Sequence, residues 1–173
     1  VSNYTDKPNA ILTFPGVPRE LYAMWPAGEA FLKQQLQSQG IQSQVMVTRF
    51  LHFFGIGESK IALELSHLMN GQNPTVAPYV GRSEVRIRLV AKANTEAEAL
   101  ALIEPIKQTC IARLPQFYFA EGKTTDDVQI EAVVADLLKE KGLTIAVAES
   151  CTGGLVSSRL TDITGSSQYT SLN

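Results

Sequence analysis

Residues 44–119 carry the pattern that most constrains the fold of this chain, because strand-like and helix-like stretches follow one another in the order β-α-β-β-α-β. The clearest of them is Glu84–Lys92, in which apolar residues occupy every second position from Val85 to Ala91. This alternation predicts a strand with one buried face and one largely solvated face. The order of elements predicts a split arrangement that forms an α+β sandwich. The other expected strands are Val45–Phe54, Thr75–Tyr79 and Phe117–Phe119, and the expected helices are Ser59–Met69 and Glu96–Leu114.

Polar stretches flank this run on both sides. Gln37–Ser43 is small and polar with one glycine, and Ala120–Asp126 is charged, small and polar. Such compositions are typical of linkers. We therefore expect three parts in the chain: residues 1–36, a middle domain over residues 44–119, and residues 127–173.

The first part is short. Ala10–Phe14 is typical of a strand, and Arg19–Met24 of a helix with Pro18 in its first turn. Pro26 is expected to end or kink that helix, which then restarts over residues 27–36. One strand and one or two helices bury too little surface to close a domain, so we expect an incomplete remnant.

The third part begins with a helix and continues into a polar turn. The helix is expected over Val128–Lys141, with Asp126 or Asp127 as its cap and Gly142 as its stop. Leu143–Ala148 is an apolar run, typical of a strand covered on both faces. A turn and a second helix, over about residues 155–162, follow it, which predicts the start of an incomplete α/β domain.

The turn, Glu149–Gly154, gathers side-chain oxygens, a thiol and two glycines in six residues. Backbone N–H groups between a strand end and a helix start favour a negatively charged ligand. A hydroxyl there could help to hold a phosphate or could act as a nucleophile. The alternative is an ordinary strand–helix connection whose Ser and Thr only cap the helix.

Composition excludes several classes of function. The chain has 173 residues, of which 45% are hydrophobic and 18% charged, and its net charge is −2, so nothing favours nucleic-acid binding electrostatically. Its two cysteines form no disulfide framework, which favours a reducing cytoplasm. His52 and His67 have no second ligand at metal-binding spacing, so we expect no zinc site and no cofactor. Both ends of the chain suggest a piece of a longer protein.

Three motifs, taken together, resemble the competence/damage-inducible CinA family. FPGVPRELYAMW at Phe14–Trp25 resembles the end of its molybdopterin-binding-like domain, and FFGIGESKIALEL at Phe53–Leu65 the start of its KH-like domain. AESCTGG and LTDITGSS, between Ala148 and Ser167, resemble the start of its C-terminal domain. The resemblance implies pyridine-nucleotide metabolism: a deamidase of nicotinamide mononucleotide in the C-terminal domain and an ADP-ribose pyrophosphatase in the N-terminal one.

The resemblance also implies roles for single residues. The nucleophilic serine of the family's deamidase matches Ser167, and an activating Lys and a Tyr would follow beyond Asn173, so we expect the chain alone to be inactive. The residues that match the family's substrate pocket are Glu149, Ser150, Thr152, Gly153, Gly154 and Ser166.

Two other functions stay open. The middle domain could be a non-catalytic packing or dimerisation module, which would make the protein a homo-oligomer. RNA binding is a weaker option, because the sequence lacks the G-x-x-G loop by which KH domains clamp a nucleic-acid backbone and its pI is about 5.7.

Overall fold

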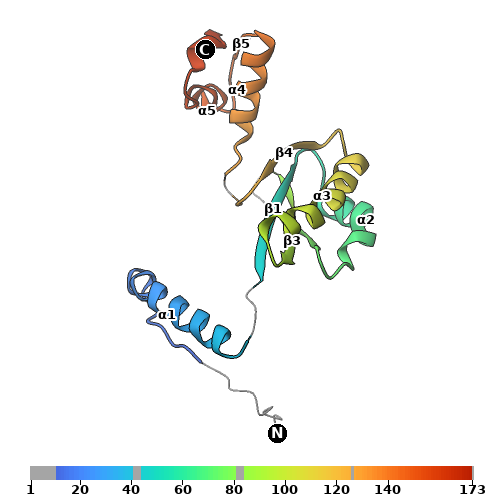
Figure 1. Cartoon of the computed structure of the whole chain (residues 1–173). Helices are drawn as coiled ribbons and strands as arrows, with labels where there is room; N and C mark the ends of the chain where they lie inside the picture. The colour runs from blue at the N-terminus through green and yellow to red at the C-terminus, as the bar shows by residue number, and fades with distance from the viewer. Residues whose placement is uncertain (1–10, 41–43, 81–83, 126, 173) are drawn as a thin grey trace. The chain divides into compact units, whose positions relative to one another are not determined.

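A computed structural model describes residues 11–40, 44–80, 84–125 and 127–172 (Figure 1). The chain divides into two compact units, Val1–Gln44 and Val45–Asn173. Helices and an antiparallel sheet occur together in the second unit, which confirms the expected α+β class. None of the helices within the described ranges is long and apolar enough to cross a membrane.

The first unit consists of one helix and the segment that precedes it. Helix α1, Pro18–Ser38, continues through Pro26, so of the two outcomes expected at this proline, an end or a kink, the end does not occur. Proline removes one hydrogen bond from the helix. Next to this proline, the Phe14 ring packs against the Trp25 ring, with 5.7 Å between the ring centroids. Phe14 also lies so close over Gly28 that a Cβ there would collide with the ring.

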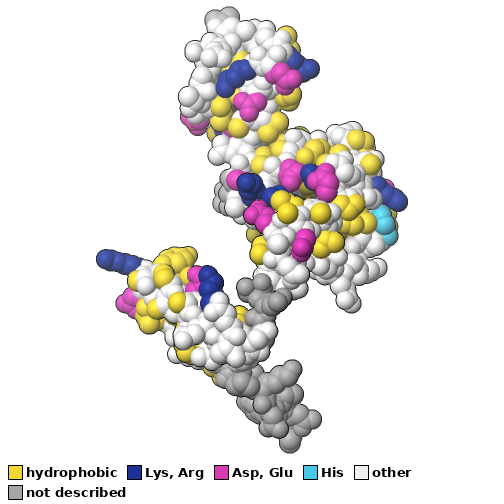
Figure 2. Space-filling view, viewed as in Figure 1, with side chains coloured by type: hydrophobic (Ala, Val, Ile, Leu, Met, Phe, Trp, Pro, Cys, Tyr) yellow, Lys and Arg dark blue, Asp and Glu magenta, His cyan; other side chains and the backbone are white. Residues whose placement is uncertain are grey.

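The strand expected over Ala10–Phe14 does not form in its described part. Residues 11–15 have no regular secondary structure, and Ala10 lies outside the described residues. A strand needs a neighbour for its N–H and C=O groups, and no described strand pairs with this segment. Hydrophobic side chains also remain on the surface of α1 (Figure 2), among them Tyr22, which is 75% exposed.

The central sandwich, residues 45–122, contains a four-stranded antiparallel sheet in the order β2-β3-β1-β4. The second strand, Thr75–Val80, lies at an edge of the sheet and contains Pro78, which has no N–H to donate to a neighbouring strand. The fourth strand is longer than expected and includes the first three of the seven residues of the predicted second linker, because Phe50 and Leu51 pair with Gly122 and Glu121. The strands are β1 Val45–Phe53, β2 Thr75–Val80, β3 Val85–Ala93 and β4 Tyr118–Gly122.

Helices α2, Glu58–Met69, and α3, Glu96–Arg113, cover one face of this sheet (Figure 1). The Thr95 hydroxyl accepts a hydrogen bond from the Glu98 N–H at 3.2 Å, which caps α3. The predicted alternation in β3 and the predicted helical stripes together form the core. Its fully buried members include Leu51, Phe53, Ile61, Leu65, Ile87, Leu89, Ala91, Ala99 and Cys110.

The second face of the sheet is only partly solvated. Arg88 on β3 is exposed, as expected, but Phe50 and His52 on β1 are buried. Phe50 meets the Tyr79 ring edge-on at 6.4 Å, and His52 meets the Phe119 ring at 5.7 Å. An aromatic side chain of the neighbouring β4 and one of β2, on the far side of β3, therefore contact β1 on this face.

The C-terminal segment, residues 127–172, has a second, small core made of Ala135, Leu160 and Tyr169. Strands β5 and β6 pair in parallel, so residues 25 positions apart, Ile145 and Thr170, lie side by side. The elements are helix α4 Ile130–Lys141, strand β5 Ile145–Ala146, helix α5 Leu155–Thr161, the 3-10 helix Ser166–Gln168 and strand β6 Thr170–Leu172.

Two expectations for this segment are wrong in part. Helix α4 begins at Ile130 and neither aspartate is its cap: Asp126 lies outside the described residues, and the Asp127 carboxylate accepts from the Lys123 N–H at 2.6 Å. The apolar run forms only a two-residue strand whose Ala146 is exposed, because its partner β6 is itself only three residues long. Gly142 ends α4 in the left-handed conformation, at φ 62°, as predicted.

Candidate functional site

The turn from Glu149 to Gly154 connects the β5 region to helix α5. Gly153 and Gly154 have φ values of 60° and 90°, a region that a residue with a Cβ rarely adopts. Gly154 is the N-cap residue of α5, and no side chain at this position caps the helix. Ser150, Cys151 and Thr152 are exposed around it.

The Glu149 carboxylate caps helix α5 in place of its N-cap residue, the glycine Gly154. Its Oε2 accepts from the Val156 N–H at 2.9 Å, and its Oε1 accepts from the Ser157 N–H at 2.8 Å. These two donors lack partners within the helix because they belong to its first turn. Two of the N–H groups expected to favour a negatively charged ligand are therefore occupied by the chain's own carboxylate.

Hydrogen bonds to this carboxylate lower the pKa of Glu149 from 4.5 to about 2. The largest contribution comes from the Thr152 side chain, and the N–H groups of Ser157 and Val156 add to it, while partial desolvation acts in the opposite direction. Glu149 is therefore ionised at neutral pH.

Ser166 and Ser167 lie in a second turn, which follows Gly165 in the left-handed conformation at φ 82°. The Ser166 hydroxyl is half-buried and donates to the Thr161 carbonyl oxygen at 3.3 Å. The Ser167 side chain is exposed, and no hydrogen bond of its hydroxyl is found with any described residue. Of the two, Ser167 is the one whose oxygen is open to a ligand.

Lys139 and Tyr169 hold this second turn, and the sequence patterns did not indicate either role. The Lys139 ammonium donates to the Thr164 carbonyl oxygen at 3.2 Å and lies 5.6 Å from the centre of the Tyr169 ring. The Tyr169 hydroxyl donates to the Leu160 carbonyl oxygen at 2.7 Å, and its side chain is fully buried. Neither contact has a sequence signal, because each joins residues that only the tertiary fold brings together.

An ion pair fixes α5 to α4. The Arg159 Nε and Nη2 atoms lie 3.0 and 2.7 Å from the two carboxylate oxygens of Glu131. Hydrogen bonding to Arg159 lowers the pKa of Glu131, and the same contact raises the pKa of Arg159. The pair borders an apolar cavity of about 260 Å³, which is lined by Ile130, Val134, Ile145, Val156 and Leu160 together with the pair itself.

The histidines lie in the central sandwich and not in the C-terminal segment. His52 is fully buried on β1, with Nδ1 3.3 Å from both carboxylate oxygens of Glu84, and its Nε2 has no partner among the described groups. His67 is exposed in the last turn of α2. Within the described part of the chain, no three His, Cys, Asp or Glu side chains are grouped as a metal site would require.

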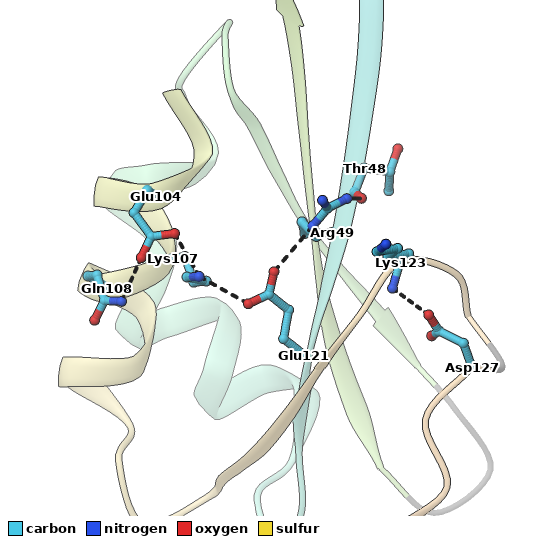
Figure 3. A network of polar contacts seen from close by, with 8 residues as sticks. All are labelled: Thr48, Arg49, Glu104, Lys107, Gln108, Glu121, Lys123 and Asp127. Carbon is cyan, nitrogen blue, oxygen red and sulfur yellow. Dashed lines mark hydrogen bonds and ion pairs between the residues drawn. The ribbon is translucent and has the colours of Figure 1, made fainter. Parts of the chain in front are cut away.

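A polar network on the central sandwich pairs charged residues with one another (Figure 3). The Glu121 carboxylate lies 3.3 Å from the Arg49 Nε and 3.0 Å from the Lys107 Nζ, and Lys107 also contacts Glu104 at 2.7 Å. Hydrogen bonding to Lys107 lowers the pKa of Glu104, and the same bond raises the pKa of Lys107. The network joins β1, α3 and β4, so its role is structural.

The two thiols differ in their surroundings. Cys110 is fully buried on α3, and burial raises its pKa to about 11. Cys151 is exposed in the Glu149–Gly154 turn.

The chain combines a split β-α-β-β-α-β sandwich with a segment that has glycine turns and an exposed serine. Two family models match these two parts. The family described as the damage-inducible protein CinA KH domain matches residues 48–120. The family described as the CinA C-terminal domain matches residues 127–172. The chain belongs to the CinA family.

Known CinA-like proteins are similar in sequence to this chain over most of its length. A CinA-like protein of Nostoc sp. is 47% identical over 166 residues, which cover 94% of this chain and 37% of that protein. A CinA-like protein of Crocosphaera subtropica is 45% identical over 159 residues, which cover 92% of this chain and 37% of that protein. The chain therefore spans little more than a third of the length of these relatives.

Proposed function

We propose that this chain is part of a CinA protein that hydrolyses the amide of nicotinamide mononucleotide, with Ser167 as the nucleophile. The observation that carries the proposal is the exposed Ser167 hydroxyl, which follows the left-handed Gly165 and has no hydrogen bond to a described residue. The match of residues 127–172 to the CinA C-terminal domain supports it.

The chemistry needs more than the serine. Its oxygen would add to the amide carbonyl carbon, ammonia would leave with a proton, and water would then release the carboxylate product. A serine hydroxyl is too weak a nucleophile without a base, and both histidines belong to the central sandwich. The family resemblance implies that a lysine outside the described residues takes the proton.

The test compares ammonia release from nicotinamide mononucleotide by this chain and by a version extended through the native C-terminus. We expect turnover only by the extended chain, and loss of that turnover in Ser167→Ala. Ser158→Ala is the matched control, because Ser158 is an exposed serine of the same segment outside the matched motif. Turnover that survives Ser167→Ala would contradict the assignment of Ser167 as the nucleophile. Rapid turnover by the chain without the extension would contradict the need for a base outside the described residues.

For the central sandwich we propose a second, non-catalytic role in packing or dimerisation. Its sheet and its two helices share one hydrophobic core, and the charged residues of the network in Figure 3 pair with one another. Sedimentation of the full chain over the micromolar range measures this role. A concentration-dependent dimer is expected, and a monomer throughout would rule out dimerisation.

A further inference from the structure

The Glu149–Gly154 turn is closed by contacts within the chain. The Glu149 carboxylate reaches forward seven and eight residues to the N–H groups of Val156 and Ser157. The Thr152 hydroxyl hydrogen-bonds to the same carboxylate, and the Thr152 carbonyl oxygen accepts from the Leu155 N–H at 3.1 Å. The carboxylate therefore joins the beginning of the turn, its middle and the helix that follows.

We propose that Glu149 is a positioning residue: its carboxylate is the anion of the α5 N-terminus, it sets the conformation of Ser150–Gly154, and it keeps a ligand phosphate away from this helix end. Each carboxylate oxygen accepts a hydrogen bond from a backbone N–H of α5, which fixes the side chain against this helix end. The catalytic consequence rests on the proposed function, whereas the structural role does not.

The argument against a phosphate at this place is electrostatic. A helix N-terminus stabilises one negative group through its unpaired N–H donors. Here an ionised side chain already contacts two of these donors, and a phosphate placed beside it would meet a like charge. A phosphorylated substrate bound at the turn would therefore present a part other than its phosphate to Ser150 and Thr152.

The first test uses the 173-residue chain and amide hydrogen exchange measured by NMR. In Glu149→Gln we expect the exchange of the Val156 and Ser157 amides to accelerate at least about tenfold, as loss of a hydrogen bond to a charged group predicts. Glu131→Gln is the matched control, because Glu131 also holds α5, through Arg159, without contacting the turn. Unchanged exchange at Val156 and Ser157 in Glu149→Gln would overturn the proposal.

The same samples test the exclusion of phosphate. Titration with inorganic phosphate should leave the Val156 and Ser157 signals of the unsubstituted chain in place. In Glu149→Ala, where the two N–H groups are freed, we expect these signals to move. Phosphate-dependent shifts at these amides with Glu149 in place would overturn the exclusion.

The second test uses the chain extended through the native C-terminus. If Glu149 acts by positioning the turn, Glu149→Gln should lower kcat/KM for nicotinamide mononucleotide and for nicotinamide riboside, which lacks the phosphate, by the same factor. Loss confined to the phosphorylated substrate would show instead that the residue acts at the phosphate. If the extended chain hydrolyses neither substrate, the proposed function fails, while the exchange and phosphate titrations still decide the role of Glu149.

Discussion

The Tyr169 hydroxyl donates a 2.7 Å hydrogen bond to the Leu160 carbonyl oxygen inside the small core of the C-terminal segment. Both residues are buried, and together with Ala135 they form that core. The bond ties the end of α5 to the residue that immediately precedes β6. It therefore fixes the chain on both sides of the turn that carries Ser166 and Ser167.

Tyr169→Phe should destabilise this segment by ~1–2 kcal/mol, because a buried carbonyl oxygen loses its partner. The measurement is amide hydrogen exchange in α4 and α5. Tyr22→Phe, on an exposed tyrosine of α1, is the control and should change nothing there. Equal protection in Tyr169→Phe and the unsubstituted chain would show that the bond contributes no stability.

The lowered pKa of Glu149 predicts the direction of a pH effect. Because the pKa falls from 4.5 to about 2 in the folded chain, the stabilisation is fully present above pH 4.5 and is lost as the pH falls towards 2. Protection of the Val156 and Ser157 amides, corrected for intrinsic exchange, should decrease over that range. In Glu149→Gln this decrease should disappear, and its persistence would assign it to another group.

Gly122→Ala should destabilise the central sandwich by ~1–3 kcal/mol through overpacking. A Cβ at this position would collide with the Asp127 carboxylate and lie 3.0 Å from Val128 Cγ2 and 3.1 Å from His52 Nε2. Urea unfolding followed by circular dichroism measures the change. Gly16→Ala is the control, because nothing lies within 4 Å of its Cβ position. Equal unfolding midpoints for the two variants would contradict the packing seen here.

The two thiols should differ in reactivity. Cys110 is fully buried and its pKa is about 11, so it carries almost no thiolate at pH 8, whereas Cys151 is exposed. Mass spectrometry after brief treatment with iodoacetamide should show one adduct in the native chain, at Cys151, and two in denaturant. An adduct at Cys110 of the native chain would mean that α3 opens on the time scale of the reaction.

Local sequence patterns predicted the elements that depend on local rules. The alternation from Val85 to Ala91 identified β3, because side chains of a strand alternate between faces. Gly142 identified the end of α4, because a glycine after the last turn lets the chain satisfy the helix's own carbonyl groups. These features need no information from distant residues.

The failures share a physical cause, which is pairing between distant residues. Ala120–Gly122 has the composition of a linker but forms a strand because β1 offers a partner. The apolar run after Gly142 has the composition of a buried strand, but only Ile145 and Ala146 pair with β6. In the candidate site, Glu149 was identified from its motif, whereas its bonds to Val156 and Ser157 depend on how the two glycines turn the chain.

Lys139 gives the last prediction, because it is the cation that joins α4 to the turn before Ser167. Its ammonium donates to the Thr164 carbonyl oxygen at 3.2 Å and lies 5.6 Å from the centre of the Tyr169 ring. Lys139→Met keeps much of the apolar stem but removes both contacts, together with an exposed 3.9 Å ion pair to Asp136, so we expect a loss of ~0.5–1.5 kcal/mol. The amides of Gln168 and Tyr169, which donate to Gly165 and Ser166 within this turn, should exchange faster.

Lys141→Met is the matched control for this substitution, because Lys141 is an exposed lysine in the last turn of the same helix. It removes the same charge near the same helix end, where a cation is favourable, but it leaves the Thr164 contact intact. A selective effect of Lys139→Met on Gln168 and Tyr169 would therefore come from the contact and not from the helix dipole. Equal effects of both substitutions on these amides would contradict a role for Lys139 in holding the Ser167 turn.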